Sequence, residues 1–358
     1  MSLVLFNEHA CTDGSVIVEI TLNAEKTLNA LAYEMIELIE PKLEAYAADA
    51  RVAAILLDSA GDKAFCAGGD IVSLYHSLQD SERKDFCRTY FEREYRMDHL
   101  IHTYPKPIIV WGSGIVMGGG IGLMAGASHR IVTPSSMLAM PEVTIGLYPD
   151  VGASWFLNRF PGRTGLFAGL TGARLNAQDA IFCALADRIM LPEQRGPLLD
   201  ALRAQPWQRE DSHQLVDRLV RNMQALPSQC GPQSKLREHF DSINALLDVD
   251  TVEQCVERFA AQPDDGSWLS KSCQTALAGS PLSLALIFEQ LKRSIHMSLA
   301  QVFDTELHLS VEVCRSGDIA EGIRALLIDK DKSPHWRYPN INAVDRTVVK
   351  KMLSQRFQ

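Results

Sequence analysis

The stretch GIVMGGGIGLMAG, residues 114–126, places three consecutive glycines between two apolar segments. The preceding residues, KPIIVWGSGI at 106–115, have the pattern of a buried strand, and Ile121, Leu123 and Met124 continue as a buried helix. The glycines therefore form a loop that enters a helix, whose first N–H groups point outward with positive dipole character. Such a loop can bind a phosphate, a carboxylate or a developing oxyanion.

A competing interpretation of the same stretch is the dinucleotide-binding fingerprint. Gly120, Gly122 and Ala125 match G-x-G-x-x-G/A after a strand, and Glu142 follows at about the expected distance. That fingerprint usually ends the first strand of its domain, whereas at least two strand patterns come earlier here. The match is therefore weak.

A second glycine-rich turn, AFCAGGDI at 64–71, follows the apolar strand pattern AAILLDS at 53–59. Consecutive glycines allow positive φ and let the backbone approach a ligand closely. Asp70 is expected to cap a following helix. A tight strand-to-helix turn without a ligand explains this segment equally well.

Strand and helix patterns alternate up to about residue 205. VIVEITL at 16–22 alternates as a strand does, and 129–140 contains two short strand patterns around a turn at 134–136. Helical stretches lie between the strands, over 70–103 and after the glycine triplet. This alternation predicts an α/β core.

The character of the chain changes after about residue 205, where strand patterns fade and amphipathic helical patterns take over. These patterns cover 234–247, 251–261, 281–299 and 300–315. We therefore expect a core over residues 1–205 and a helical C-terminal region over residues 206–358, packed on that core.

Composition restricts the class of protein. The 358 residues, 46% hydrophobic and 22% charged, are typical of a soluble globular chain of about two domains. A net charge of -9 argues against nucleic acid or an anionic membrane as the main partner. No apolar run approaches the roughly 18–20 residues of a membrane span.

The cysteines and the N-terminal residues suggest a compartment. The eight cysteines form no C-x-x-C pair and no zinc-type spacing, so reduced thiols in a cytoplasmic protein are expected. The first residues, MSLVLFNEHACTDG, have the features of neither a secretory signal nor a transit peptide.

Two carboxylates, Glu142 and Asp150, occur in the apolar segment MPEVTIGLYPDVG at 140–152. Helix capping or surface exposure explains each acid separately, because Asp150 precedes a helical pattern. A functional interpretation is that two nearby carboxylates in a poorly solvated site have separated pKa values. One then acts as a base and the other as an acid.

Taken in order, AFCAGGDI, VMGGGIGLMAG and AMPEVTIGLYPDVGASWFLNRF resemble the crotonase (enoyl-CoA hydratase/isomerase) superfamily over roughly residues 10–200. Within it, the chain looks most like the 3-hydroxyisobutyryl-CoA hydrolase group, on the basis of FEREY at 91–95, PDVG at 149–152 and EGIRALLIDKDKSPHW at 321–336. The resemblance implies an α/β fold, a crotonase-like spiral of ββα repeats with a helical C-terminal extension, that holds an acyl-CoA thioester.

The resemblance also implies an oxyanion hole formed by the N–H groups of Gly69 and Gly119, with Ala67 beside it in the substrate-binding set. Losing one such donor typically costs about 3–4 kcal/mol of transition-state stabilisation. Because this hole takes the place of a Lewis acid, we expect no metal. We also expect no cofactor beyond the coenzyme A of the substrate.

The superfamily shares the oxyanion hole but not one reaction, so side chains must indicate the chemistry. A hydratase resembling enoyl-CoA hydratase carries one glutamate shortly after the glycine triplet and another after the proline of the later loop. Glu142 occupies the later position, but Gly122 occupies the earlier one and cannot handle a proton. In the hydrolase group, the pair corresponding to Glu142 and Asp150 serves thioester hydrolysis.

Our hypothesis gives Glu142 the role of base or nucleophile, whereas Asp150 positions water or supplies a proton. A covalent anhydride and direct attack by water both stay open. Glu94 is a third candidate, which by resemblance accepts a hydrogen bond from a β-hydroxyl group of the substrate. Its charged neighbours favour an ordinary position on a solvated helix instead.

The sequence thus predicts an acyl-CoA thioester hydrolase acting on 3-hydroxyisobutyryl-CoA, a step that the resemblance places in valine breakdown. The alternatives are an enoyl-CoA hydratase or isomerase with Glu142 as its single base, and a non-catalytic acyl-CoA-binding protein. The expected partner is the small-molecule acyl-CoA, with neither nucleic acid nor membrane. A homo-oligomer stays open, because relatives often form trimers but the helical extension could replace those contacts.

Overall fold

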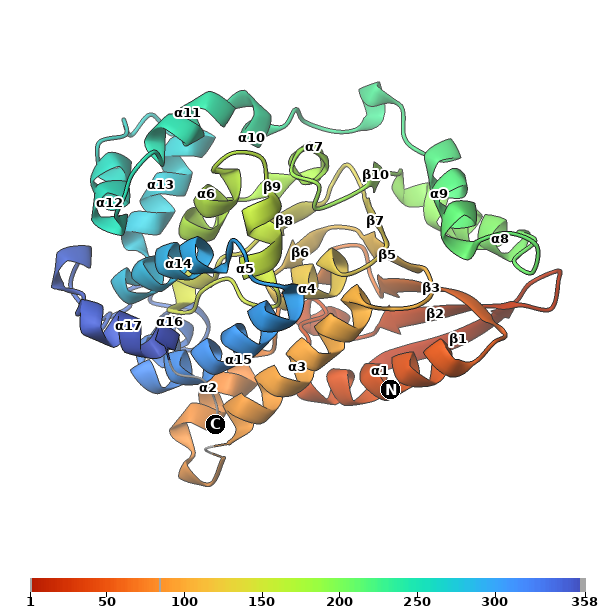
Figure 1. Cartoon of the computed structure of the whole chain (residues 1–358), viewed down its shortest axis with the longest axis horizontal. Helices are drawn as coiled ribbons and strands as arrows, with labels where there is room; N and C mark the ends of the chain where they lie inside the picture. The colour runs from red at the N-terminus through yellow and green to blue at the C-terminus, as the bar shows by residue number, and fades with distance from the viewer. Residues whose placement is uncertain (1, 84, 355–358) are drawn as a thin grey trace. The chain divides into compact units, whose positions relative to one another are not determined.

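The computed structural model describes residues 2–83 and 85–354 (Figure 1). Its strands form a six-stranded sheet in the order β1-β2-β3-β5-β7-β10 and a four-stranded sheet in the order β4-β6-β8-β9. The strands are β1 (Val4–Ala10), β2 (Val16–Leu22), β3 (Val52–Ser59), β4 (Ala64–Cys66), β5 (Ile108–Gly112), β6 (Ile115–Met117), β7 (His129–Val132), β8 (Met137–Ala139), β9 (Leu175–Asn176) and β10 (Arg188–Ile189).

Three consecutive repeats supply both sheets. Each sends one strand to the six-stranded sheet, a three-residue strand to the four-stranded sheet, and then a helical segment. The repeats are β3-β4-α2 (Ile71–Gln79), β5-β6-α4 (Gly119–Ala125) and β7-β8 followed by the 3-10 helix Glu142–Ile145. Because β3, β5 and β7 pair in parallel, each repeat must cross over before it returns to the sheet. The predicted spiral of ββα repeats is confirmed.

The chain forms two compact units that interleave along the sequence. The first, here called the sheet unit, takes its described residues from Met1–Gly69, Arg96–Leu138 and Leu175–Ser234. The second, here called the helical unit, takes its described residues from Asp70–Tyr95, Ala139–Arg174 and Lys235–Gln358.

These units do not follow the predicted boundary between residues 205 and 206. The physical reason is that residues 70–95 and 139–174 pack with the helices after residue 235 rather than with the sheets. The core over 1–205 and the helical region over 206–358 therefore do not describe the packing of the chain. As a functional division they stay a prediction.

In the sheet unit, α8 (Arg195–Arg203) and α9 (Ser212–Asn222) cover one face of the six-stranded sheet. Ile17, Leu56 and Ile109 from the strands share a buried cluster with Leu198 and Val216 from these helices. Each side chain of this size contributes about 1.5–3 kcal/mol when it leaves water completely. The other helices of the sheet unit are α1 (Tyr33–Ala48), α4 and α7 (Ala177–Phe182).

The helical unit confirms the predicted C-terminal helices, because the described chain after residue 205 contains helices and no strand. Ser280 and Ser298 accept backbone N–H bonds as N-caps, so the patterns at 281–299 and 300–315 become two separate helices. The helices of this unit are α2, α5 (Ala153–Phe156), α6 (Thr164–Thr171), α10 (Lys235–Glu238), α11 (Phe240–Leu246), α12 (Val252–Ala260), α13 (Trp268–Ala278), α14 (Pro281–Ser294), α15 (Leu299–Ser316), α16 (Asp318–Ile323) and α17 (Arg346–Ser354). A further helix, α3 (Phe86–His102), begins in this unit.

The single strand predicted over 106–115 is wrong. The structure has two strands there, β5 and β6, in two different sheets. Gly114 between them has φ 67°, a backbone conformation that glycine adopts at little cost. The Ile115 N–H then donates to the Lys63 carbonyl, which directs the chain into the second sheet.

Among the residues that the structure describes, no helix is both long enough and apolar enough to cross a bilayer.

The packing around the glycine triplet predicts a difference between two Gly→Ala variants. A Cβ at Gly120 would lie 2.4 Å from the Cys66 carbonyl oxygen, whereas a Cβ at Gly196 would meet nothing within 4 Å. Both glycines are helical, so alanine brings both a gain in helix propensity. We expect overpacking to lower the free energy of unfolding of Gly120→Ala by about 1–3 kcal/mol.

Urea unfolding followed by circular dichroism measures this difference. Gly196→Ala serves as the matched control and should leave the free energy of unfolding unchanged or slightly higher. Equal effects of the two substitutions would contradict the close packing of the triplet on Cys66.

Candidate active site

In the sheet unit, the two glycine-rich turns lie side by side. β4 and β6 are parallel neighbours, with Cys66 opposite Val116, so the turns that follow them leave the same edge of the sheet. Gly68 and Gly118 have φ of 115° and 47°, which lets each backbone bend sharply at this edge. The close approach of Gly120 to Cys66 brings the two backbones together.

Both predicted oxyanion donors lie in these turns. In the described part of the chain, the N–H groups of Gly69 and Gly119 take no part in backbone hydrogen bonds. Gly118, the N-cap of α4, has no side chain that could cap the helix. Ala67 differs, because its N–H donates to the Leu28 carbonyl at 3.1 Å and so fixes the turn. The roles of all three residues in substrate binding stay predictions.

In the helical unit, the predicted pair of acids lies on one buried loop. Glu142 is 5% exposed and Asp150 is 4% exposed. The N-cap of α5 is Gly152, so the Asp150 side chain does not cap that helix. Capping by Asp150 and surface exposure of Glu142 are therefore both wrong as explanations.

Asp150 ends a chain of hydroxyl groups. Tyr95 on α3 donates to the Asp150 Oδ2 atom at 2.5 Å, and its hydroxyl lies 2.7 Å from the Ser310 Oγ atom. Ser310 lies 2.9 Å from the Tyr148 hydroxyl, which donates to the Glu306 carbonyl at 2.8 Å. Tyr95 and Ser310 are buried as well, so water does not replace these partners.

The supply of protons in this chain depends on Asp150. Four contacts link the chain, but its three hydroxyl groups supply only three protons. When Asp150 is ionised, Tyr95 donates to it, and Ser310 can donate to one tyrosine only. When Asp150 carries a proton, each group can donate to the next and all the contacts are satisfied. The chain therefore accommodates Asp150 in both protonation states.

Glu142 has no comparable support. Its Oε2 atom is buried and has no hydrogen-bond partner among the residues that the structure describes. Buried polar atoms are nearly always paired, and strongly perturbed acids concentrate at functional sites. Burial raises the pKa of Glu142 well above its usual range, and the charge of Asp150 raises that pKa further.

The two acids influence each other. Burial raises the pKa of Asp150 to about 6, while the hydrogen bond from Tyr95 lowers it. Because the charge of Asp150 opposes the ionisation of Glu142 in a buried loop, a state in which only one of the two acids is ionised is favoured. Such a pair can supply one acid and one base, as the sequence predicted.

Glu94 is buried, with 2% exposure, so its assignment to a solvated helix face is wrong. It directly precedes Tyr95 on α3. Burial and the charge of Asp150 raise the pKa of Tyr95 well above its usual range, and Glu94 adds to this effect. Glu94 thus belongs to the same buried acidic region of the helical unit as Asp150.

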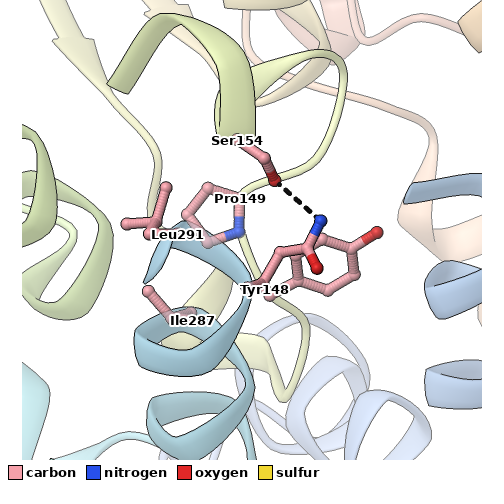
Figure 2. Close-up of a pocket in the computed structure, with 6 residues that line it drawn as sticks. Tyr148, Pro149, Ser154, Ile287 and Leu291 are labelled. Atoms are coloured by element: carbon pink, nitrogen blue, oxygen red, sulfur yellow. Dashed lines mark hydrogen bonds between the residues drawn. The ribbon is translucent and has the colours of Figure 1, made fainter. Parts of the chain in front are cut away.

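A small hollow lies beside the loop of the two acids (Figure 2). It is too narrow to admit a water molecule, so it cannot hold an acyl chain. The Gln290 amide donates to the Ser154 hydroxyl at 3.2 Å across it, which ties α14 to the loop. The lining residues are Tyr148, Pro149, Ser154, Ile287, Gln290 and Leu291.

Sequence reasoning missed the hydroxyl chain that ends at Asp150, namely Tyr95, Ser310 and Tyr148. A signal for Ser310 existed, because it is a polar residue on the apolar face of α15, near Leu309 and Val313. No comparable local pattern relates Tyr95 to the loop.

The comparison with known proteins gives a consistent family. The chain matches the family model described as Enoyl-CoA hydratase/isomerase over residues 17–353. It is 37% identical over 322 residues to the mitochondrial 3-hydroxyisobutyryl-CoA hydrolase of Gallus gallus, covering 89% of this chain and 81% of the relative. It is 34% identical over 342 residues to the mitochondrial 3-hydroxyisobutyryl-CoA hydrolase of Homo sapiens, covering 95% of this chain and 86% of the relative.

Two solved structures are similar over almost the whole chain. An enoyl-CoA hydratase from Rhodobacter sphaeroides 2.4.1 has a TM-score of 0.85 at 34% identity, covering 99% of this chain and 97% of that one. A carnitinyl-CoA dehydratase from Mycobacterium thermoresistibile has a TM-score of 0.87 at 31% identity, with coverage of 99% and 97%. The predicted α/β fold with a helical C-terminal region agrees with both.

The expected cytoplasmic location is contradicted by the same comparison, because the curated relatives from Gallus gallus and Homo sapiens are mitochondrial. The cysteines could not identify a compartment. All eight are free and buried, which fits any reducing environment.

The raised pKa of Asp150 predicts a pH-dependent contribution to stability. Because burial raises this pKa from 3.8 to about 6, the folded chain binds the Asp150 proton more tightly than the unfolded chain does. The resulting stabilisation is fully present below about pH 4 and is lost as the pH rises to about 6. Asp150→Asn removes it.

Urea unfolding at about pH 4 and about pH 7 tests this sign. The wild type should lose more stability across that interval than Asp150→Asn does. An equal loss in both proteins would show that the pKa of Asp150 is not raised.

Tyr95→Phe should raise the pKa of Asp150 further, because the tyrosine hydrogen bond lowers that pKa. The titration of the protonated Asp150 carboxyl can be followed by its infrared C=O band, which Asp150→Asn identifies by deletion. Tyr104→Phe is the matched control, since Tyr104 donates to the Leu43 carbonyl in the sheet unit. A midpoint that stays at the wild-type pH in Tyr95→Phe would contradict the hydrogen bond.

Proposed function

The chain belongs to the enoyl-CoA hydratase/isomerase family, and from this premise we propose that the protein hydrolyses a short-chain β-hydroxyacyl-CoA thioester. The proposed substrate is 3-hydroxyisobutyryl-CoA, and the products are 3-hydroxyisobutyrate and coenzyme A. This substrate is the one in the names of curated relatives that are 34% and 37% identical to this chain.

The observation that carries the proposal is the buried pair Glu142 and Asp150, which share one loop in which the charge of Asp150 raises the pKa of Glu142. Thioester hydrolysis needs a group that attacks the carbonyl or activates water, and a proton for the departing thiolate. A pair of carboxyl groups that holds one proton supplies both. Gly122, where a hydratase of the family carries its other glutamate, supplies neither.

In the proposed reaction, the N–H groups of Gly69 and Gly119 bind the thioester oxygen. That oxygen gains negative charge as the carbonyl carbon is attacked. Two N–H donors without competing acceptors are suited to this charge and need no reorganisation when it develops. Each donor is expected to contribute about 3–4 kcal/mol to the transition state.

Glu142 acts as the base or nucleophile, and Asp150 supplies the proton. Because the pKa of Glu142 is raised further than that of Asp150, the proton of the pair starts on Glu142 and must pass to Asp150 before the attack. In the route with direct attack, Glu142 accepts a proton from water as the water oxygen bonds to the carbonyl carbon. The carbon–sulfur bond then breaks, and Asp150 donates its proton to the thiolate. Transfer of the proton from Glu142 to Asp150 then prepares the pair for the next attack. The hydroxyl chain from Tyr95 supports this cycle, because it accommodates Asp150 with and without its proton.

A covalent route through Glu142 is the second form of the same reaction. There the carboxylate attacks the carbonyl carbon and forms a mixed anhydride, which water then hydrolyses. A single turnover in oxygen-18 water separates the two routes. Label in Glu142 shows the anhydride, whereas label in the product alone shows direct attack.

The remaining predicted residues bind the substrate in this proposal. Glu94 accepts a hydrogen bond from the β-hydroxyl group, and its burial supports a role away from solvent. Ala67 contributes the fixed turn beside Gly69. Coenzyme A enters as part of the substrate, and the reaction as written uses neither a metal nor a further cofactor. Such a hydrolase serves valine breakdown.

The second candidate is an enoyl-CoA hydratase or isomerase with Glu142 as its single base. One observation favours it, since similar solved structures carry the names of a hydratase and a dehydratase. The support for Asp150 from Tyr95 and Ser310 has no function in that reaction.

The test follows thiol release from 3-hydroxyisobutyryl-CoA and loss of the enoyl absorbance of crotonyl-CoA. We expect thiol release by the wild type, and a fall in kcat of about 100- to 10,000-fold in both Glu142→Gln and Asp150→Asn. The matched controls are Glu37→Gln and Asp304→Asn, whose side chains are exposed. Both should keep wild-type activity.

Other outcomes point elsewhere. Hydration of crotonyl-CoA without thiol release, lost in Glu142→Gln and kept in Asp150→Asn, would support the hydratase. Binding of the CoA ester without any turnover would support a non-catalytic acyl-CoA-binding protein.

A further inference from the structure

A third buried carboxyl group, that of Glu306, contacts the backbone of the Asp150 loop. It lies on α15 and is 0% exposed. Its Oε2 atom accepts the Gly152 N–H at 2.7 Å, and its Oε1 atom accepts the Ser154 N–H at 2.9 Å. The two oxygens of Glu306 therefore bind the backbone N–H groups that lie two and four residues after Asp150.

The loop needs such support because its conformation is unfavourable. Val151 and Gly152 both have left-handed backbones, with φ of 52° and 84°. A β-branched residue such as Val151 rarely adopts this region and does so where its surroundings hold it. The Ala153 N–H returns to the Asp150 carbonyl at 2.8 Å and closes the turn.

The burial of Glu306 is costly in itself. Burial raises the pKa of Glu306 to about 8, although the hydrogen bonds from Ser154 and Gly152 lower it and the charge of Asp150 raises it again. An apolar side chain would fill the same place without this cost. A carboxyl group at this position therefore indicates a requirement of the loop rather than of general stability.

α15 reaches Asp150 by a second path. Ser310, one helical turn after Glu306, contacts the Tyr95 hydroxyl that donates to Asp150. The Tyr148 hydroxyl joins both, since it contacts Ser310 and donates to the Glu306 carbonyl. One helix thus controls the backbone of the Asp150 loop and the side-chain partners of Asp150.

We propose that Glu306 is a positioning residue, whose carboxyl group holds the Asp150–Ser154 turn in the conformation in which Asp150 meets Tyr95. Its action on the reaction rests on the proposed function, in which Asp150 supplies the proton. Its action on the loop does not. Glu306 itself does not contact the reacting atoms in this proposal.

The experiment compares Glu306→Gln with Asp304→Asn, which makes the same replacement of a carboxyl group by an amide at an exposed position of α15. The glutamine offers one oxygen and turns an NH2 group toward one of the two backbone N–H groups. We expect kcat to fall about 100-fold while KM stays within about threefold, since misplacement of a catalytic group affects chemistry more than binding. Asp304→Asn should keep both constants.

A second measurement reports on Asp150 without turnover. Carbon-13 at the tyrosine Cζ atoms gives a Tyr95 signal, which Tyr95→Phe assigns by deletion. This signal should shift in Glu306→Gln as the hydrogen bond to Asp150 changes, and should stay in place in Asp304→Asn. The charged and titratable groups facing Glu306 in this region are Asp150, Tyr95 and Tyr148.

The outcomes separate positioning from a merely structural role. If Glu306→Gln melts at a lower temperature but keeps kcat per folded molecule and keeps the Tyr95 signal, the proposal is wrong. If Glu306→Gln does not fold, Gly152→Ala tests the same turn, because φ there is 84° and the added Cβ would lie 3.1 Å from the Phe303 ring. An unchanged kcat and Tyr95 signal in Gly152→Ala would then overturn the proposal.

Failure of the proposed function looks different. If the wild type releases no thiol from 3-hydroxyisobutyryl-CoA, the hydrolase is excluded and the Tyr95 signal alone decides about Glu306. A shift in Glu306→Gln supports its action on the loop, and the absence of a shift overturns it.

Discussion

A carboxyl group that leaves water needs either a proton or hydrogen-bond donors, and this constraint organises the helical unit. Asp150 has the Tyr95 hydroxyl, and Glu306 has two backbone N–H groups. The Glu142 Oε2 atom has no such donor among the described residues. Of these three acids, two therefore have hydrogen-bond donors, whereas the Glu142 Oε2 atom has none among the described residues. That unsatisfied oxygen distinguishes Glu142 from an ordinary buried acid.

The features that could be predicted from sequence have local causes. The glycine turns follow apolar strands directly, and the helices after residue 205 have their own amphipathic patterns. The hydroxyl chain that ends at Asp150 could not be predicted as a whole, because its members Tyr95 and Ser310 meet across 215 residues of sequence. The prediction of a single strand over 106–115 was wrong because of a local backbone conformation. One left-handed glycine, Gly114, ends a strand within an otherwise continuous apolar run.

The family fold and the chemistry depend on different parts of this chain. The backbone turns at Gly69 and Gly119 arise from strand order, so any member with the same sheets can form them. The chemistry depends on single side chains. Gly122 and Asp150 differ from the residues that the resemblance gives a hydratase at these positions, and such differences need no change of fold. The solved structures with the names of a hydratase and a dehydratase align with TM-scores of 0.85 and 0.87, which shows the shared fold. The cellular compartment is not encoded in the fold or in these side chains, so the reduced cysteines could not predict the location.

The separation between Gly152 and Glu306 also sets an order of events during synthesis. These partners are 154 residues apart, and the sheet unit is complete at Ser234, well before α15 is made. At about 5–20 residues per second, the ribosome adds Glu306 roughly 8–30 seconds after the loop that it holds. During this interval the nascent chain contains both glycine turns, Glu142 and Asp150, but not yet the Glu306 side chain that binds the Asp150 loop. The Asp150 loop therefore gains its Glu306 contacts only after α15 has been synthesised.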